Sequence, residues 1–145
     1  MSEREYDLVV VGAGPAGSSA AYAAAKNGIK VALLEKEENV AQTVRTSGVT
    51  WIDYAKEFGI PEDCYNPIRT YNFCSPKNNV SISDEQAKAA VLDVRKTYRF
   101  LADQAKNNGA EIFVGAITDE ILGEEDRIDS CHYLNFTVLK NFICS

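Results

Sequence analysis

The segment that most constrains the fold of this 145-residue chain runs from Tyr6 to Glu35. It opens with the apolar, β-branched run Leu8–Val11, which is typical of a buried parallel strand. The alanine-rich residues 16–26 predict a helix that stops at Asn27-Gly28, and residues 29–34 predict a second strand. Strand, helix and strand together indicate one βαβ unit of the usual length.

Three glycines between the first strand and the helix have the spacing G-x-G-x-x-G. Gly12 is expected to permit the sharp turn out of the strand, Gly14 to let a pyrophosphate approach the backbone, and Gly17 to let the helix pack closely on the strands. The helix start would then direct free N–H groups and the positive end of its dipole at the phosphates. Pro15 suits the first turn, where its missing N–H costs nothing.

Glu35 ends the second strand, at the distance from the glycines that a dinucleotide fingerprint requires. A carboxylate there can accept hydrogen bonds from ribose hydroxyls, and it would repel a 2′-phosphate, so NADP is disfavoured at this site. The competing interpretation is a tight turn in an ordinary α/β domain. We favour dinucleotide binding because strand, glycines, helix, strand and acid all agree.

Composition excludes several other functions. The net charge is −6, without a basic stripe, so nucleic acid is not an expected partner and the chain as a whole is not attracted to anionic lipid. Apolar runs are far shorter than a membrane span and no secretory signal is present, which predicts a cytoplasmic protein. The four cysteines form no C-x-x-C pair and there is a single histidine, so we expect no metal site.

Beyond Glu35 the chain continues as a polar connection, residues 36–44. Arg45 follows and could bind a pyrophosphate, although a solvated loop arginine explains it equally well. Gly48 could let the backbone approach a ring. Apolar residues at a helical period over residues 51–58 predict a helix whose aromatic face lies in the core.

The middle of the chain predicts a second kind of sheet. Alternating segments on both sides of a turn cluster indicate a β-hairpin over residues 68–83, which we interpret as the start of an inserted substrate-binding sheet. Asp93 is predicted to cap a helix that runs to Asn108. Residues 110–114 read as a third parallel strand and residues 117–122 as a further short strand.

Residues 6 to about 122 resemble the N-terminal part of FAD-dependent oxidoreductases of the glutathione-reductase-like superfamily, through VVVGAGPAGSSAA and VALLEKE. More narrowly, RTSGVTWI, the hairpin and LDVRKTYRFLADQAKNNGAEIFVGA resemble the geranylgeranyl reductase family, although they overlap with aromatic-ring hydroxylases of the same fold. Geranylgeranyl reductases saturate isoprenoid chains, including those of archaeal membrane lipids. The resemblance implies FAD as cofactor, an isoprenoid lipid substrate, NAD(P)H or ferredoxin as electron donor, and contact with the periphery of the membrane.

The resemblance also implies a set of cofactor-binding residues: Gly12, Gly14, Pro15, Ala16, Gly17, Glu35, Lys36, Arg45, Gly48 and Arg95. For Arg95, a helix-surface arginine is an equal alternative. Thr46 and Ser47 stand where many family members have a cysteine before the glycine, so we assign no thiol role here. We assign no catalytic residue, because no histidine, carboxylate pair or thiol stands out as a proton donor.

The predicted fold class is α/β: a Rossmann-like FAD-binding fold with a parallel sheet and an inserted small antiparallel sheet. We expect the FAD-binding domain over residues 1–128 and an atypical tail over residues 129–145. The family's later glycine–aspartate motif is not found, so we expect an incomplete fold. Three functions stay open: FAD-dependent reduction of C=C bonds in geranylgeranyl chains, a hydroxylase-type FAD monooxygenase, and a truncated, non-catalytic nucleotide-binding module.

Overall fold

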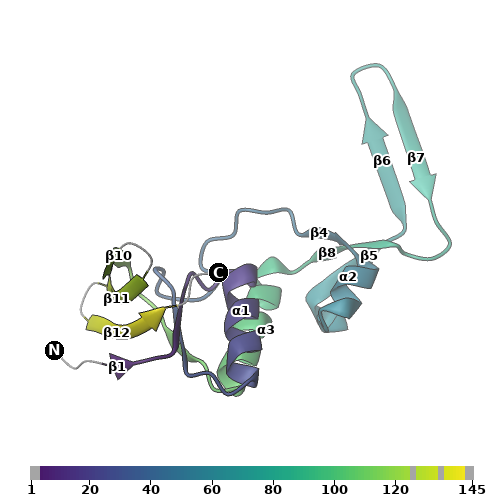
Figure 1. The fold of residues 1–145 in the computed structure, drawn as a ribbon. Coiled ribbons are helices and arrows are strands. Elements are labelled where there is room, and N and C mark those ends of the chain that lie inside the picture. The colour runs from purple at the N-terminus through teal and green to yellow at the C-terminus, as the bar shows by residue number, and fades with distance from the viewer. Residues whose placement is uncertain (1–3, 125–126, 134–135, 143–145) are drawn as a thin grey trace. The chain divides into compact units, whose positions relative to one another are not determined.

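The computed structural model describes residues 4–124, 127–133 and 136–142, with side-chain surroundings for residues 4–118 (Figure 1). The chain divides into two compact units. The first comprises residues 1–43 with 98–145, and the second comprises residues 44–97.

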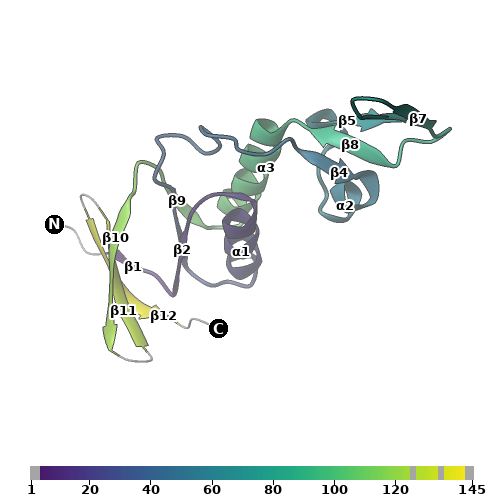
Figure 2. The same cartoon turned by 90° about the horizontal axis from the view of Figure 1, so that it is seen from above.

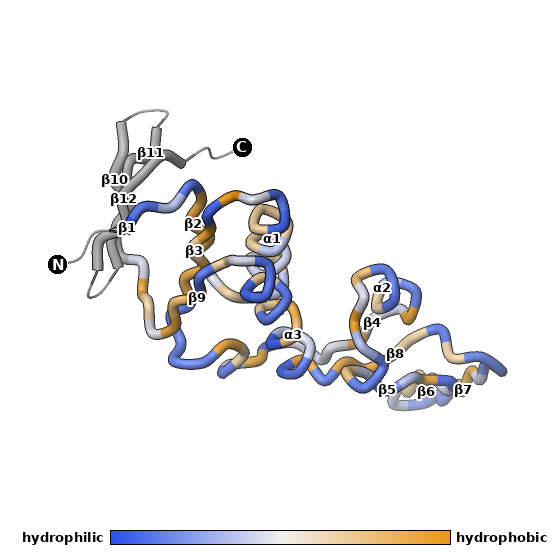
Figure 3. Tube along the Cα trace, turned by 90° about the horizontal axis from the view of Figure 1, so that it is seen from below, coloured by the Kyte–Doolittle hydropathy of each residue, from blue (hydrophilic) through white to orange (hydrophobic). Residues whose placement is uncertain are grey.

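The first unit contains the predicted parallel sheet. Its strands are β2 (Leu8–Val11), β3 (Val31–Leu34) and β9 (Glu111–Phe113), in the order β2-β3-β9 and parallel throughout. All four residues of β3 are buried, as expected for a strand covered on both faces. β2 and β3 are accordingly the most hydrophobic strands of this sheet (Figure 3). The three predicted parallel strands are confirmed.

Two helices cover one face of this sheet. α1 (Pro15–Lys26) and α3 (Val94–Asn107) lie side by side in both views (Figures 1 and 2). Their contact with β3 is made by small side chains, and the buried cluster includes Ala21, Ala25 and Ala105. Because alanine occupies little volume, the helices approach the sheet closely. The predicted stop of α1 is confirmed, since the N–H groups of Asn27 and Gly28 bond back to its last turn.

A second sheet of the first unit has the order β1-β12-β11-β10. β1 is parallel to β12, and the other pairs are antiparallel; the strands are β1 (Arg4–Glu5), β10 (Thr118–Glu124), β11 (Arg127–Tyr133) and β12 (Phe136–Phe142). β10 confirms the short strand predicted over residues 117–122. Residues 129–145 carry β12 and most of β11, and the domain boundary that we placed before them stays a prediction.

The second unit contains a three-stranded antiparallel sheet that we did not predict in full. Its order is β4-β8-β5, with β4 (Val49–Trp51), β8 (Ala89–Leu92) and β5 (Tyr65–Ile68). The short helix α2 (Ile52–Glu57) and the 3-10 turn η1 (Glu62–Cys64) connect β4 to β5. Strands of three or four residues show too few alternations to be recognised in a sequence.

The predicted hairpin is confirmed as β6 (Thr70–Cys74) and β7 (Asn79–Ser83), which pair antiparallel. The prediction that the aromatic face around α2 lies in the core is wrong. Trp51, Tyr54 and Phe58 are exposed, and only Ala55 of the helix is buried. Less than two turns of helix bury little more than one side chain, so the helical period here does not mark a core. Within the described residues, no helix is long and apolar enough to cross a bilayer.

Candidate functional site

The turn between β2 and α1 has a geometry that only glycine adopts readily at its first position. Gly12 has φ +96°, in the region where a Cβ atom collides with the backbone, and its N–H donates to the carbonyl of Leu34 at 2.7 Å. The chain therefore leaves β2 abruptly while it remains attached to the end of β3. This sharp turn is the role that we predicted for Gly12 from the sequence.

Gly14 is a glycine for a different reason. It is the N-cap of α1, with φ −73° and ψ −178°, a conformation that any residue adopts. A Cβ atom at this position would have no neighbouring atom within 4 Å. Neither the backbone nor the packing of the described residues thus requires glycine here. The missing side chain leaves space directly in front of the helix start, where a phosphate group would fit.

Gly17 is required by packing. A Cβ atom here would overlap the carbonyl oxygen of Gly12 and lie 3.3 Å from Cγ1 of Val10. The first turn of α1 consequently lies directly against the end of β2. Each of the three glycines thus has its own physical explanation: backbone conformation for Gly12, open space for Gly14 and close packing for Gly17.

The start of α1 presents donors without a helical acceptor. The first bond of the helix runs from the N–H of Ser18 to the carbonyl of Gly14 at 2.9 Å. The N–H groups of Ala16 and Gly17 precede it, and Gly14 supplies no side-chain cap. The first turn has no acidic side chain, and Pro15 and Ala16 are exposed. This end of the helix therefore combines accessible N–H groups with the positive end of the dipole, which favours an anion.

Glu35 points at this turn. Its Oε2 accepts a hydrogen bond from the N–H of Ala13 at 2.8 Å, and its Oε1 accepts one from the N–H of Glu37 at 3.0 Å. Each carboxylate oxygen keeps a further lone pair, so the group can still accept bonds from ribose hydroxyls. The sequence suggested the ribose role alone. The structure adds that Glu35 joins the glycine turn to the loop after β3.

Open space, accessible N–H groups and a neighbouring carboxylate together fit the pyrophosphate and ribose of a dinucleotide. Lys36 follows Glu35 and is exposed. The remaining predicted site residues belong to the second unit, and the structure does not relate them to the glycine turn: Arg45, Gly48 and Arg95.

Gly48 has a structural role inside the second unit. Its φ is +73°, and a Cβ atom would lie 2.7 Å from Cγ2 of Val94 and 2.9 Å from the carbonyl oxygen of Leu92. The loop before β4 therefore packs directly on the start of α3, next to Arg95. Arg45 and Arg95 are both exposed. Roles for these three residues toward a cofactor stay predictions.

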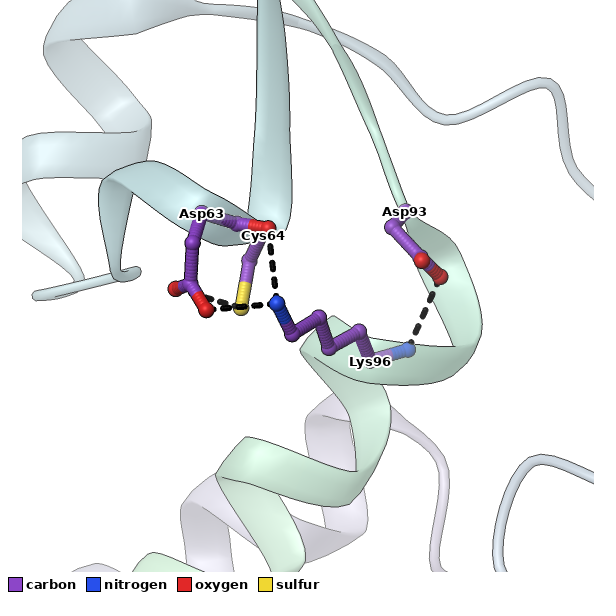
Figure 4. Close-up of polar contacts among 4 residues, drawn as sticks. All are labelled: Asp63, Cys64, Asp93 and Lys96. Atoms are coloured by element: carbon purple, nitrogen blue, oxygen red, sulfur yellow. Dashed lines mark hydrogen bonds and ion pairs between the residues drawn. The ribbon is translucent and has the colours of Figure 1, made fainter.

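A polar cluster that the sequence did not reveal surrounds the start of α3 (Figure 4). Oδ1 of Asp93 accepts a hydrogen bond from the N–H of Lys96 at 3.0 Å, which confirms the predicted N-cap. Nζ of Lys96 donates to the carbonyl oxygen of Asp63 at 3.0 Å and forms an ion pair with the carboxylate of the same residue. The N–H of Asp93 donates to the carbonyl of Cys64 at 2.8 Å. These bonds fasten η1 to the helix start.

The pKa shifts in this cluster indicate that it stabilises the fold and does not take part in chemistry. The hydrogen bond from Lys96 lowers the pKa of Asp63, and the same bond raises the pKa of Lys96. Burial, together with the charge of Asp63, raises the pKa of the Cys64 thiol, so this group stays protonated near neutral pH and is a poor nucleophile. The sequence carries no signal for the cluster because Asp63 and Lys96 are far apart along the chain.

Comparisons with known proteins agree with this geometry. The FAD dependent oxidoreductase family (DAO) matches residues 7–74. A digeranylgeranylglycerophospholipid reductase of Methanocaldococcus jannaschii is 38% identical over 113 residues, covering 75% of this chain and 28% of the reductase. A protein from the nifH2 5′ region of Methanosarcina barkeri is 35% identical, covering 83% of this chain and 71% of that protein.

Among solved structures, a geranylgeranyl bacteriochlorophyll reductase-like protein of Thermoplasma acidophilum superposes with a TM-score of 0.84 at 25% identity. The match covers 96% of this chain and 38% of that protein. This chain thus spans well under half the length of the reductases that it matches.

Proposed function

We propose that the glycine turn of this chain binds the ADP half of FAD in an enzyme that reduces C=C bonds of geranylgeranyl chains. The premise is that the chain belongs to the geranylgeranyl reductase family of FAD-dependent oxidoreductases. FAD is the cofactor of the family. The observation that carries the proposal is the open start of α1 with Glu35 beside it. The digeranylgeranylglycerophospholipid reductase of Methanocaldococcus jannaschii supplies the substrate class, an isoprenoid glycerophospholipid.

Each residue of the turn has a defined task in this proposal. The space left by Gly14 admits the pyrophosphate, and the N–H groups of Ala16 and Gly17 donate to it. Glu35 accepts hydrogen bonds from the adenosine ribose and disfavours a 2′-phosphate, so the site selects FAD over NADP. Lys36 and Arg45 add positive charge near the phosphates.

The cofactor carries the redox chemistry. Reduced FAD, when bound, would supply a hydride to one carbon of a C=C bond, and a proton from water would complete the saturation at the other carbon. The residues of this chain contribute binding and orientation, which they achieve through a rigid turn whose backbone is tied to the end of β3. NAD(P)H or ferredoxin remains the proposed electron donor. Arg95, at the start of α3, is proposed as a further contact of the cofactor.

A fluorescence titration of the purified chain with FAD tests the cofactor site. Gly14→Val should abolish binding, because the new side chain occupies the phosphate space. Ala23→Val is the matched control, since it adds the same side chain to an exposed position of α1 away from the turn. Equal FAD affinity in the wild type and Gly14→Val would rule out the assigned site. ADP should compete with FAD, and NADP should not.

The substrate is tested separately. The chain, FAD and a chemical reductant are incubated with a geranylgeranyl glycerophospholipid, and the lipid is analysed by mass spectrometry. The proposal predicts a gain of two hydrogens per reduced double bond. FAD binding without any mass gain would retain the cofactor site and contradict the reductase activity of this chain.

A further inference from the structure

Ser18 is a fully buried polar side chain in the first turn of α1. Its exposed fraction is 0%, and it shares the buried side of the helix with Ala21 and Ala25. A buried hydroxyl without a hydrogen-bond partner costs free energy, so such a group is expected to have one. None of the tasks assigned to the glycine turn in the proposed function involves this side chain.

The hydroxyl of Ser18 has its partner in the glycine turn. Oγ of Ser18 donates to the carbonyl oxygen of Ala13 at 3.3 Å. This carbonyl precedes the backbone ladder of the helix, whose first bond runs from the N–H of Ser18 to the carbonyl of Gly14. Because Ala13 is only 1% exposed, water has little access to its carbonyl. The side chain of Ser18 therefore supplies a donor that neither the helix nor the solvent provides.

The N–H of Ala13 is bonded as well, to Oε2 of Glu35 at 2.8 Å. The bond to Glu35 fixes the peptide plane that precedes Ala13, and the bond from Ser18 fixes the plane that follows it. Two separate elements, the end of β3 and the first turn of α1, thus hold the backbone of this one residue.

The plane that follows Ala13 also contains the N–H of Gly14. This peptide bond is trans, as are the other peptide bonds of the described residues, so its C=O and N–H point in opposite directions. Since the C=O points at buried Ser18, the N–H of Gly14 points away from the packed side of α1. It therefore faces the open space in front of the helix start, and no acceptor within the described ranges of the chain bonds it.

We propose that Ser18 is a positioning residue of the cofactor site, whose hydroxyl holds the carbonyl of Ala13 so that the N–H of Gly14 donates to the pyrophosphate. The inference rests on the proposed function, because the acceptor is the pyrophosphate of FAD. Gly14 thereby becomes a third donor beside Ala16 and Gly17. Pro15 has no N–H, so every backbone donor of residues 14–17 then has a task.

The expected effect follows from the strength of one oriented bond. Without the Ser18 hydroxyl, the plane after Ala13 is free to rotate, and the ligand must orient the N–H of Gly14 as it binds. A hydrogen bond to a charged group sets the scale of this loss, so Ser18→Ala should weaken ADP binding about tenfold. The same variant also removes a buried donor and lowers stability, so the affinity for one ligand does not by itself identify a positioning role.

Isothermal titration calorimetry of the full chain with two ligands separates positioning from a general loss of structure. ADP carries the pyrophosphate, whereas adenosine carries only the base and the ribose. Ser18→Ala should bind ADP more weakly than the wild type and adenosine equally well. Equal losses for the two ligands would make Ser18 a purely structural residue and overturn the proposal.

Two further variants sharpen this comparison. Ser19→Ala is the matched control, since it makes the same change at the next residue of α1, which is half-buried, and it should bind ADP like the wild type. Ser18→Cys keeps a weak donor of similar size, so its ADP affinity should lie between those of Ser18→Ala and the wild type. An affinity of Ser18→Cys no better than that of Ser18→Ala would contradict a role of the donor.

The amide resonance of Gly14 tests the wild type directly, even if Ser18→Ala fails to fold. In the isotope-labelled chain, the amide proton of Gly14 should move downfield when ADP is added, because its N–H begins to donate to a phosphate oxygen. Adenosine should leave this resonance in place. An unmoved Gly14 amide at saturating ADP would overturn the proposal.

The same measurements distinguish this inference from the proposed function on which it rests. A wild type that binds neither FAD nor ADP refutes both. A wild type that binds both, together with a Ser18→Ala variant of equal affinity, refutes the positioning role and retains the cofactor site.

Discussion

Replacing Gly17 with alanine tests whether the glycine turn is understood. The substitution adds one methyl group at a point where a Cβ atom overlaps the carbonyl oxygen of Gly12. That carbonyl cannot move away cheaply, because Gly12 is in a left-handed conformation and is bonded to Leu34. Gly17→Ala should therefore destabilise the fold, although alanine is the better helix former.

The expected size follows from two opposing effects. Overpacking costs typically 1–3 kcal/mol, and because the new methyl group meets a backbone carbonyl, the cost for Gly17→Ala is about 3 kcal/mol. The gain in helix propensity offsets about 1 kcal/mol. The net loss is about 2 kcal/mol, which lowers the melting temperature of a chain of this size by about 4–8 °C.

Gly14→Ala is the matched control, since it adds the same methyl group three residues away. No atom lies within 4 Å of the new Cβ, and the backbone is unstrained, so the stability should change by less than about 0.5 kcal/mol. FAD affinity should nevertheless fall, because the methyl group faces the phosphate space. Thermal unfolding followed by circular dichroism, together with FAD titration, measures both effects. A Gly17→Ala protein as stable as the wild type, or a Gly14→Ala protein that unfolds, would refute the reasoning.

Three further predictions concern single residues. Glu35→Ala should lower the free energy of unfolding by about 1–3 kcal/mol, because the buried N–H of Ala13 loses its acceptor, and it should also weaken FAD binding. Glu35→Gln keeps one acceptor oxygen, so it should recover most of the stability measured by urea unfolding. Lys96→Met should lower stability at neutral pH. The pKa of Asp63 is lowered by Lys96, so the wild type should lose this advantage as the pH falls below the ordinary carboxyl pKa of about 4, and the two unfolding curves should then converge. The raised pKa of Lys96 implies a second loss above about pH 10, and a difference independent of pH would contradict the ion pair. In the native chain, iodoacetamide should modify exposed Cys74 well before buried Cys64, because burial limits access to Cys64 and raises the pKa of its thiol. Peptide mass spectrometry should find equal modification rates for the two cysteines only after denaturation.

Sequence alone determined the elements that depend on neighbours along the chain. The βαβ unit could be predicted because its period, glycines and helix stop all lie within residues 6–35. The N-cap at Asp93 and the turn of the β6–β7 hairpin are likewise local, since each involves residues only a few positions apart.

Tertiary structure decided what depends on residues far apart in the chain. The pairing of β4 and β5 with β8 joins short strands that carry no period of their own, and the exposure of the aromatic side chains around α2 depends on what packs against them. The bond from Ala13 to Glu35 and the ion pair between Asp63 and Lys96 also join separate elements. Periodicity and capping act within a few residues, whereas pairing and burial arise only when the folded chain brings distant residues together.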